Sequence, residues 1–245
     1  MRARRVAAVA AVMVAGVAVT GCDVGMSGES RHGSRTFDAP HGSLTLLVDN
    51  DVTIVPGHRG RLTVDRWLTG KATRHATWRQ RGDRLTLRAP CVGVSVHCSA
   101  RYRVAVPADL PVSVATGYGQ VAARDLTGGL NVDTDNGDVA LTNVTGRIRI
   151  SDQYGGVTAG RLGSTDVTVA SENGDVRLAF TAAPKRATVR STYGAISLTV
   201  PESSYHVTTR SRYGEVSSAV TDHPAADRVI TADTDNGDVS VRTRG

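Results

Sequence analysis

Two segments with the same sequence, Asp-Thr-Asp-Asn-Gly-Asp, occupy residues 133–138 and 233–238. Oxygen ligands at alternating positions are the kind that Ca²⁺ prefers, and this ion takes six to eight of them. The glycine, however, is fifth in each segment, and the distal glutamate of a helix–loop–helix calcium site is missing. Equivalent positions elsewhere carry Ala115, Gln120 and Ala195 instead of acids. We therefore interpret the acidic residues as turn formers, and predict neither a metal ion nor another cofactor.

Four tyrosines each precede a glycine and form a candidate ligand face: Tyr118, Tyr154, Tyr193 and Tyr213. A tyrosine offers a flat apolar face with a polar tip, which suits contact with sugar rings. At three equivalent positions the residue is Asn136, Asn173 or Asn236, so the tyrosines do not form an unbroken series. The alternative is that each ring packs over its own turn or against its neighbour.

The sequence contains none of the common catalytic or phosphate-binding motifs, such as GxSxG, HExxH, SxxK or a phosphate-cradling glycine loop. We therefore predict no catalytic residues and a non-enzymatic protein. A glycan-active enzyme stays an alternative, because parallel β-helices include enzymes whose acids come from separate turns.

The charge of the 245-residue chain argues against nucleic acid as a partner. The whole chain has 29 basic and 23 acidic side chains, a net charge of +6. Residues 1–21 contain three arginines and no acids, so the remainder has 26 against 23, or +3. These charges are of mixed sign, without the basic block that a nucleic-acid-binding surface needs.

The tyrosines and asparagines belong to a repeat that the elements of the fold must position. Successive glycines of the seven pairs are 18, 18, 19, 20, 20 and 23 residues apart: Gly119, Gly137, Gly155, Gly174, Gly194, Gly214 and Gly237. Aliphatic residues predominate seven and five positions before each glycine, and a β-branched aliphatic always stands two positions after it. Three positions before it the residue is always short and polar.

This pattern predicts an all-β fold of about seven repeats, each of two short strands joined at the glycine corner. A single repeat cannot bury its apolar face alone, so neighbouring repeats must stack. A right-handed parallel β-helix, or solenoid, satisfies the pattern. An antiparallel meander or sandwich satisfies it as well, because Asn-Gly between alternating strands is also a hairpin signal.

The first 22 residues predict export and lipid anchoring. Three arginines precede an apolar run of 14 residues, Val6–Val19, which is too short to span a bilayer and fits a signal peptide. The run ends in Val-Thr-Gly-Cys, which resembles the lipobox of bacterial lipoproteins and implies cleavage after residue 21 and acylation of Cys22. The alternative is an ordinary secretory signal with a chance cysteine.

Lipid at Cys22 would leave Cys91 and Cys98 in an oxidising compartment, where we expect them to form a disulfide. A metal site with His97 is the alternative, but two thiols and one histidine at this spacing fit no standard zinc pattern.

Several short motifs occur in a fixed order along residues 37–245: Gly42–Leu46, Asp51–Gly57, Arg84–Leu87, Val104–Val112 and the Tyr/Asn-Gly-x-Val repeats. Their order resembles that of the putative-adhesin domain family of bacterial exported and membrane-linked proteins. The resemblance implies a β-helix-like fold and a surface role, and it brings no catalytic residues. The cysteine pair is a departure from the family pattern.

We therefore divide the chain into a signal peptide (1–21), a flexible tether (22–36), an N-terminal β region that caps the solenoid (37–107) and the repeat region (108–245). A separate small N-terminal domain is the alternative for residues 37–107. The expected protein is lipid-anchored on the extracytoplasmic face of the cell membrane and binds cell-wall polysaccharide, an envelope protein or a host surface without catalysis. An envelope-stress or assembly factor that acts through a membrane protein partner is a further alternative.

Overall fold

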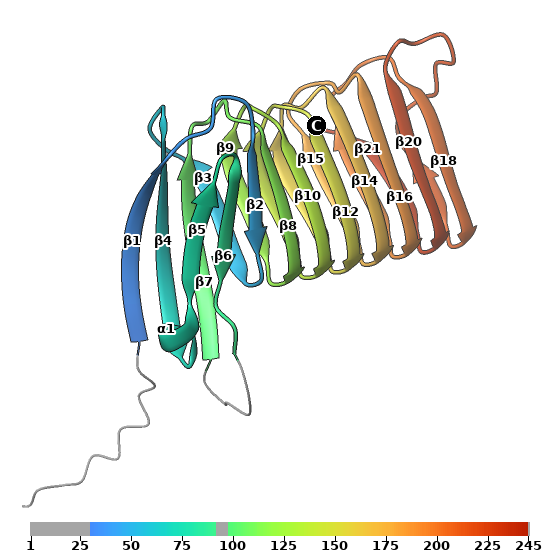
Figure 1. The fold of residues 1–245 in the computed structure, drawn as a ribbon. Helices are drawn as coiled ribbons and strands as arrows, with labels where there is room; N and C mark the ends of the chain where they lie inside the picture. Colours follow the sequence, from blue (N-terminus) through green and yellow to red (C-terminus); the bar gives the residue numbers. More distant parts are fainter. Residues whose placement is uncertain (1–29, 92–97, 245) are drawn as a thin grey trace, which may run out of the picture.

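The computed structural model describes residues 30–91 and 98–244, which form two long β-sheets (Figure 1). Sheet A has, in spatial order, β1 (Ser30–Asp38), β4 (Arg61–Gly70), β7 (Cys98–Val106), β3 (Asp51–Pro56), β9 (Val121–Leu126), β11 (Val139–Val144), β13 (Val157–Leu162), β15 (Val176–Phe180), β17 (Ile196–Val200), β21 (Val239–Thr243) and β19 (Val216–Ser218). Sheet B has β18 (His206–Tyr213), β20 (Val229–Asn236), β16 (Arg186–Tyr193), β14 (Asp166–Asn173), β12 (Ile148–Tyr154), β10 (Leu130–Asn136), β8 (Val112–Tyr118), β2 (Leu44–Val48), β6 (Arg84–Arg88) and β5 (Thr77–Arg81). A four-residue helix, α1 (Ala72–His75), follows β4.

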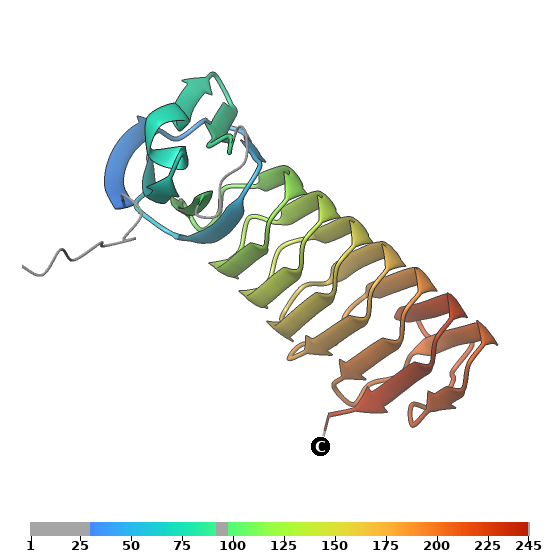
Figure 2. The ribbon, with the colours of Figure 1, turned by 90° about the horizontal axis from the view of Figure 1, so that it is seen from below.

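Each repeat contributes one strand to each sheet, and equivalent strands pair in parallel and in register. In sheet B, for example, Val132 of β10 lies opposite Val114 of β8 and Ile150 of β12. The chain therefore winds as a solenoid whose turns stack along one axis (Figure 2). The predicted all-β repeat fold is confirmed, and the antiparallel meander is wrong for the repeat region.

The core lies between the two sheets and is filled by aliphatic side chains. The positions predicted to point inward are buried in the repeats between β8 and β17, among them Val132, Ile150 and Val189. Burial of a valine or isoleucine side chain contributes about 1.5–3 kcal/mol relative to exposure. Because every turn needs its neighbours to cover this surface, the stability of the solenoid is a property of the stack.

The glycine at each corner is required by the close approach of successive turns. A Cβ atom on Gly155 would lie against the carbonyl of Gly137, and one on Gly137 would lie against the carbonyl of Gly119. Five of the seven corner glycines also have positive φ, whereas Gly155 and Gly214 do not. Backbone contact therefore explains all seven glycines, and left-handed backbone conformation explains only five.

The N-terminal region continues both sheets and then departs from the solenoid pattern. Strand β2 pairs in parallel with β8, and β3 with β9, whereas β1, β4 and β7 pair antiparallel and β5 and β6 form an antiparallel hairpin. We call the part from β1 to β7 the cap. The guanidinium of Arg66 lies 3.8 Å from the centre of the Trp78 ring and joins β4 to the hairpin.

One boundary of the predicted tether is wrong. Residues 30–36, expected to be flexible, belong to β1, which pairs with β4 along its whole length. This edge strand is exposed at most positions, so it lacks the apolar alternation by which strands are recognised in a sequence. Cys22 and residues 23–29 lie outside the described residues.

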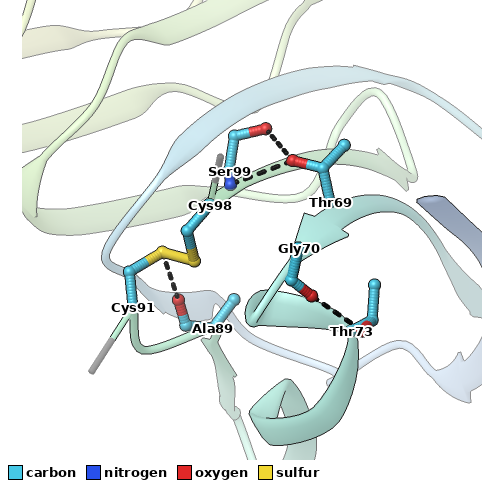
Figure 3. The surroundings of a disulfide bond; sticks show 7 residues. All are labelled: Thr69, Gly70, Thr73, Ala89, Cys91, Cys98 and Ser99. Atoms are coloured by element: carbon cyan, nitrogen blue, oxygen red, sulfur yellow. Dashed lines mark hydrogen bonds between the residues drawn. A yellow bond between two sulfur atoms is a disulfide. The ribbon is translucent and has the colours of Figure 1, made fainter. Parts of the chain in front are cut away.

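Cys91 and Cys98 form the predicted disulfide, with Cα atoms 5.8 Å apart. Figure 3 shows that the bridge lies beside the end of β4, where Gly70 is opposite Cys98 in the antiparallel register. The disulfide therefore joins the start of β7 to the segment that follows β6.

The last two turns are stacked out of sequence order. Strands β20 and β21, which come last in the chain, lie between β16 and β18 and between β17 and β19. The turn made by β18 and β19 is thus the terminal one. Its inward positions Val207, Thr209 and Ser211 are only half-buried, because no further turn covers them.

Candidate functional site

The residues that precede the corner glycines form a straight row at the carboxyl ends of the sheet B strands. The paired positions, in spatial order, are Tyr118, Asn136, Tyr154, Asn173, Tyr193, Asn236 and Tyr213. Tyrosine and asparagine alternate strictly. Tyr193 and Tyr213 belong to successive repeats in the sequence, but Asn236 lies between them in the sheet. We call this set the Tyr–Asn row.

The tyrosines of the row are exposed. Their exposed fractions are 69% for Tyr118, 55% for Tyr154, 56% for Tyr193 and 68% for Tyr213. The other two tyrosines, Tyr102 and Tyr205, are fully buried. Four of the six exposed large hydrophobic side chains of the described residues therefore lie along this one edge.

The corner explains why these side chains point into solvent. Along each sheet B strand, alternate residues enter the core as far as the short polar residue three positions before the glycine, such as Thr116 or Thr134. Two residues later the core has ended and the backbone turns, so the side chain extends beyond the sheet. The spacing of parallel strands is about 4.8 Å, so tyrosines recur about every 9.6 Å. Side chains at that distance do not stack on one another, which leaves their faces free for a ligand.

The acids that follow the corner glycines link successive turns. The Asp138 carboxylate accepts a hydrogen bond from the Gly156 N–H at 2.8 Å, and Asp175 accepts one from Ala195 at 2.9 Å. Asp238 accepts an equivalent hydrogen bond from Glu215, and Asp51, which follows Asn50 at the first corner, accepts one from Gln120. The bond from Ala195, and secondarily Arg177, holds the pKa of Asp175 below its usual value. These contacts support the interpretation of the acidic segments as corner formers.

A second polar feature lies inside the solenoid, and the sequence did not reveal its significance. The short polar residues three positions before the glycines form a buried stripe, with Asp152 between Thr134 and Ser171. Thr116 and Thr234 bond to backbone carbonyls of the corners, as expected. The side-chain oxygens of Thr134, Asp152, Ser171 and Ser191 have no protein partner. Burial, and secondarily the charge of Asp138, raises the pKa of Asp152 to about 7.

The Tyr–Asn row has the chemistry of a surface that recognises polyhydroxylated ligands. Tyrosine rings pack on the apolar faces of sugars, and asparagine amides both donate and accept hydrogen bonds. Carboxylates of Asp135, Asp235 and Glu172 lie on the same strands next to the row. Negative charge there disfavours an anionic ligand and favours hydroxyl donors. Within residues 30–91 and 98–244, no cluster of three or more His, Cys, Asp or Glu side chains could hold a metal ion.

The structure brings the four predicted ligand-face tyrosines and all seven corner glycines onto one edge, and places the disulfide in the cap. The asparagines, which were expected to interrupt the tyrosines, are a regular part of the same row. Sequence order alone hid this regularity, since Tyr193 and Tyr213 appear adjacent until the position of β20 is known.

A family model and one solved structure support this fold. The family model described as Toastrack DUF4097 matches residues 111–242. A solved structure described as a putative adhesin from Bacteroides fragilis is 11% identical, with a TM-score of 0.58, and the match covers 87% of this chain and 97% of that one. A putative cell adhesion protein from Clostridium sporogenes is 10% identical over 88% of this chain and 100% of that one, with a TM-score of 0.43.

No curated protein matches the chain. Among the described residues, no helix is long and apolar enough to cross a membrane.

Proposed function

The chain belongs to the Toastrack DUF4097 family, and we propose that it is a non-catalytic surface lipoprotein whose Tyr–Asn row binds an extended cell-wall polysaccharide. The observation that carries the proposal is the strict alternation of exposed tyrosines with asparagines along one straight edge. The description of a structural relative as an adhesin supports a binding role rather than an enzymatic one.

The spacing of the row favours a β-1,4-linked glycan. In an extended chain of this type each sugar adds about the rise of one solenoid turn, and alternate sugars present the same face. A tyrosine every second turn, about 9.6 Å apart, would meet the same face of every second sugar. The intervening asparagines would then lie beside the other sugars, where their amides can bond hydroxyl or acetamido groups.

The anchor gives the row its place in the cell envelope. Acylation of Cys22 would hold the solenoid on the outer side of the cytoplasmic membrane. Strand β1 starts at the same edge of the molecule that carries the row (Figure 1). Ser30 is eight residues after Cys22, and a chain of that length can span at most about 28 Å. The row therefore lies within reach of wall polymer close to the membrane surface.

Retention on purified peptidoglycan tests the proposal. The test protein is the chain from residue 22 with Cys22→Ser, so that no lipid contributes to binding. We expect saturable retention of this protein, and loss of at least tenfold in affinity when the four row tyrosines are changed to alanine. Stacking of a nucleic-acid base on an aromatic side chain contributes about 1–3 kcal/mol, and a loss of tenfold needs only the lower end of that range from one of the four rings.

Two controls make the result specific. The fourfold Tyr→Phe variant keeps the rings and is expected to keep most of the binding. The Trp67→Ala variant removes an exposed aromatic from the cap and is expected to bind as the parent does. Retention that survives the fourfold alanine change, or retention on envelope protein alone, would contradict the proposal and favour a protein partner.

A further inference from the structure

The cap carries a second candidate site, on the outer face of β1, β4 and β7. A hollow of about 300 Å³ lies there, and its lining includes His32, Trp67, Thr69, Ser99 and Arg101. The antiparallel register places His32 opposite Trp67, and Trp67 opposite Arg101. Three adjacent strands therefore each contribute a side chain at the same level.

The lining of this hollow is basic. Its basic side chains are Arg101 and His32, and no carboxylate of the described residues lines it, although Asp51 of β3 lies opposite Arg101 in the parallel register. Arg101 makes no ion pair with any residue that the structure describes. Behind the sheet lies Arg66, whose pKa is lowered by burial and also by the charge of Arg31. Arg31 alternates with His32 along β1, so its side chain lies on that inner side with Arg66 and not in the hollow.

Hydroxyl groups and an aromatic ring complete the lining. The Thr69 and Ser99 hydroxyls are 2.8 Å apart, and the Ser99 N–H donates to Thr69 Oγ1 at 3.1 Å, as Figure 3 shows. Both hydroxyls are thus held in place on the face that carries Arg101. Trp67 is 41% exposed, and its ring centre is 5.1 Å from that of His32.

The chemistry favours a phosphate group over other anions. The planar fork of an arginine matches phosphate oxygens, and hydroxyls donate to the same oxygens. An exposed tryptophan beside them is typical of side chains that lie at the headgroup level of a bilayer. Strand β1, which lines the hollow, begins at Ser30, only eight residues after Cys22.

We propose that this hollow docks the cap onto the membrane by binding the phosphate of an anionic phospholipid headgroup. The contact is independent of the Tyr–Asn row and of glycan binding. The diacylated cysteine that the lipobox predicts would hold the chain on the membrane, but it would leave the orientation of the solenoid free. The hollow would add a second contact and would fix how the solenoid stands on the bilayer.

Vesicle flotation tests the proposal with the unlipidated chain from residue 22 carrying Cys22→Ser. We expect binding to phosphatidylcholine vesicles that contain phosphatidylglycerol, no binding to phosphatidylcholine alone, and loss of binding at high salt. An arginine near an anionic surface contributes about 1 kcal/mol, so Arg101→Gln is expected to weaken binding about fivefold. The double change His32→Ala with Arg101→Gln is expected to weaken it further.

Arg103→Gln is the matched control, because Arg103 projects from the same face of β7 two residues away and lies opposite Asp65. It removes the same charge but lies outside the hollow, and it is expected to keep most of the binding. Equal losses for Arg101→Gln and Arg103→Gln would overturn the proposed site. So would the absence of binding to phosphatidylglycerol vesicles.

A separate titration with inorganic phosphate distinguishes a headgroup from free phosphate. The Trp67 indole N–H signal in an NMR spectrum reports occupancy of the hollow. Saturation by inorganic phosphate without vesicle binding would overturn membrane docking in favour of a soluble phosphate ligand. Circular dichroism of each variant confirms that the fold is kept.

Discussion

Asp152 is the buried side chain with the largest consequence for stability. It is 2% exposed, neither carboxylate oxygen has a protein partner, and the pKa is raised to about 7. In the unfolded chain an aspartate titrates near 3.9. The folded chain therefore holds the proton more tightly, and ionisation of Asp152 between about pH 4 and pH 7 lowers the free energy of unfolding.

Asp152→Asn is expected to remove this penalty. Relative to the parent, the variant should gain free energy of unfolding as the pH rises from about 4 to about 7, by up to about 1.4 kcal/mol per pH unit, and the gain should then level off. Urea unfolding of both proteins across this pH range measures the difference in their free energies of unfolding. Contributions of other carboxylates, such as Asp175, are the same in both proteins and cancel in this difference. A difference that does not change with pH would contradict the raised pKa.

The requirement for glycine at the corners can be tested with two substitutions in one turn of the solenoid. Gly155→Ala places a Cβ against the carbonyl of Gly137, although the backbone of Gly155 is not left-handed. Because the backbone of the neighbouring turn must move, we expect a loss of about 1–3 kcal/mol in the free energy of unfolding. Gly160→Ala in the following strand is the control, since its Cβ has no atom within 4 Å. It should change stability by less than about 0.5 kcal/mol, and equal losses would argue against close stacking as the reason for the glycine.

Among the elements, the position of β20 between β16 and β18 leads to a prediction that the order of strands in the sequence would not give. Arg190 of β16 lies opposite Asp233 of β20, and Arg210 of β18 lies on the far side of Asp233. Cysteines introduced at 190 and 233 are expected to form a disulfide under mild oxidation, because neighbouring strands are about 4.8 Å apart. Cysteines at 190 and 210, about twice as far apart, should remain reduced. Peptide mapping by mass spectrometry distinguishes the pairs, and the reverse result would place β18 next to β16.

The elements also show what the sequence could predict and what it could not. The alternation of aliphatic residues around each corner predicted the strands from β8 to β17, because side-chain direction in a strand depends on local sequence. The parallel arrangement and the position of β20 depend on which strands pair, and strands of nearly identical pattern do not specify this. Strands β1 and β5 escaped prediction for another reason. They are edge strands with mostly exposed side chains, so they lack the apolar signal.

The candidate site, like the fold, could be predicted from the sequence only in part. The residues of the Tyr–Asn row share one position in the repeat, so alignment of the repeats is enough to group them. Their strict alternation does not follow from that alignment, because it arises only when Asn236 enters between Tyr193 and Tyr213. The hollow in the cap was not predicted at all. Its residues come from three strands that are distant in the sequence, and no motif connects them.

At the scale of the molecule, the two proposals assign different contacts to the cap and to the solenoid. Strand β7 begins three residues before Arg101, which lies at the level of the first corner, opposite Asp51. The cap therefore projects about 10 Å beyond the edge that carries the row. If this projection rests on the bilayer, the row is held about 10 Å above the membrane surface.

The length of the row predicts how affinity depends on the length of the glycan. Six strand spacings separate Tyr118 from Tyr213, a distance of about 29 Å. A β-1,4-linked hexasaccharide of N-acetylglucosamine can contact three tyrosines at once, whereas a disaccharide contacts one. Because contacts after the first are made at high effective concentration, we expect the hexasaccharide to bind at least tenfold more tightly. Calorimetric titration measures both affinities.

Changing the two middle tyrosines, Tyr154 and Tyr193, to alanine should remove most of this dependence on length while leaving disaccharide binding at the ends of the row. The two remaining tyrosines, Tyr118 and Tyr213, are too far apart for one short oligosaccharide to contact both, so each would bind a separate oligosaccharide. The Trp67→Ala protein should keep the full dependence, since Trp67 lies in the cap. Equal affinity for the two oligosaccharides in the parent protein would mean that a single corner binds the sugar, and that the regular spacing of the tyrosines has no part in recognition.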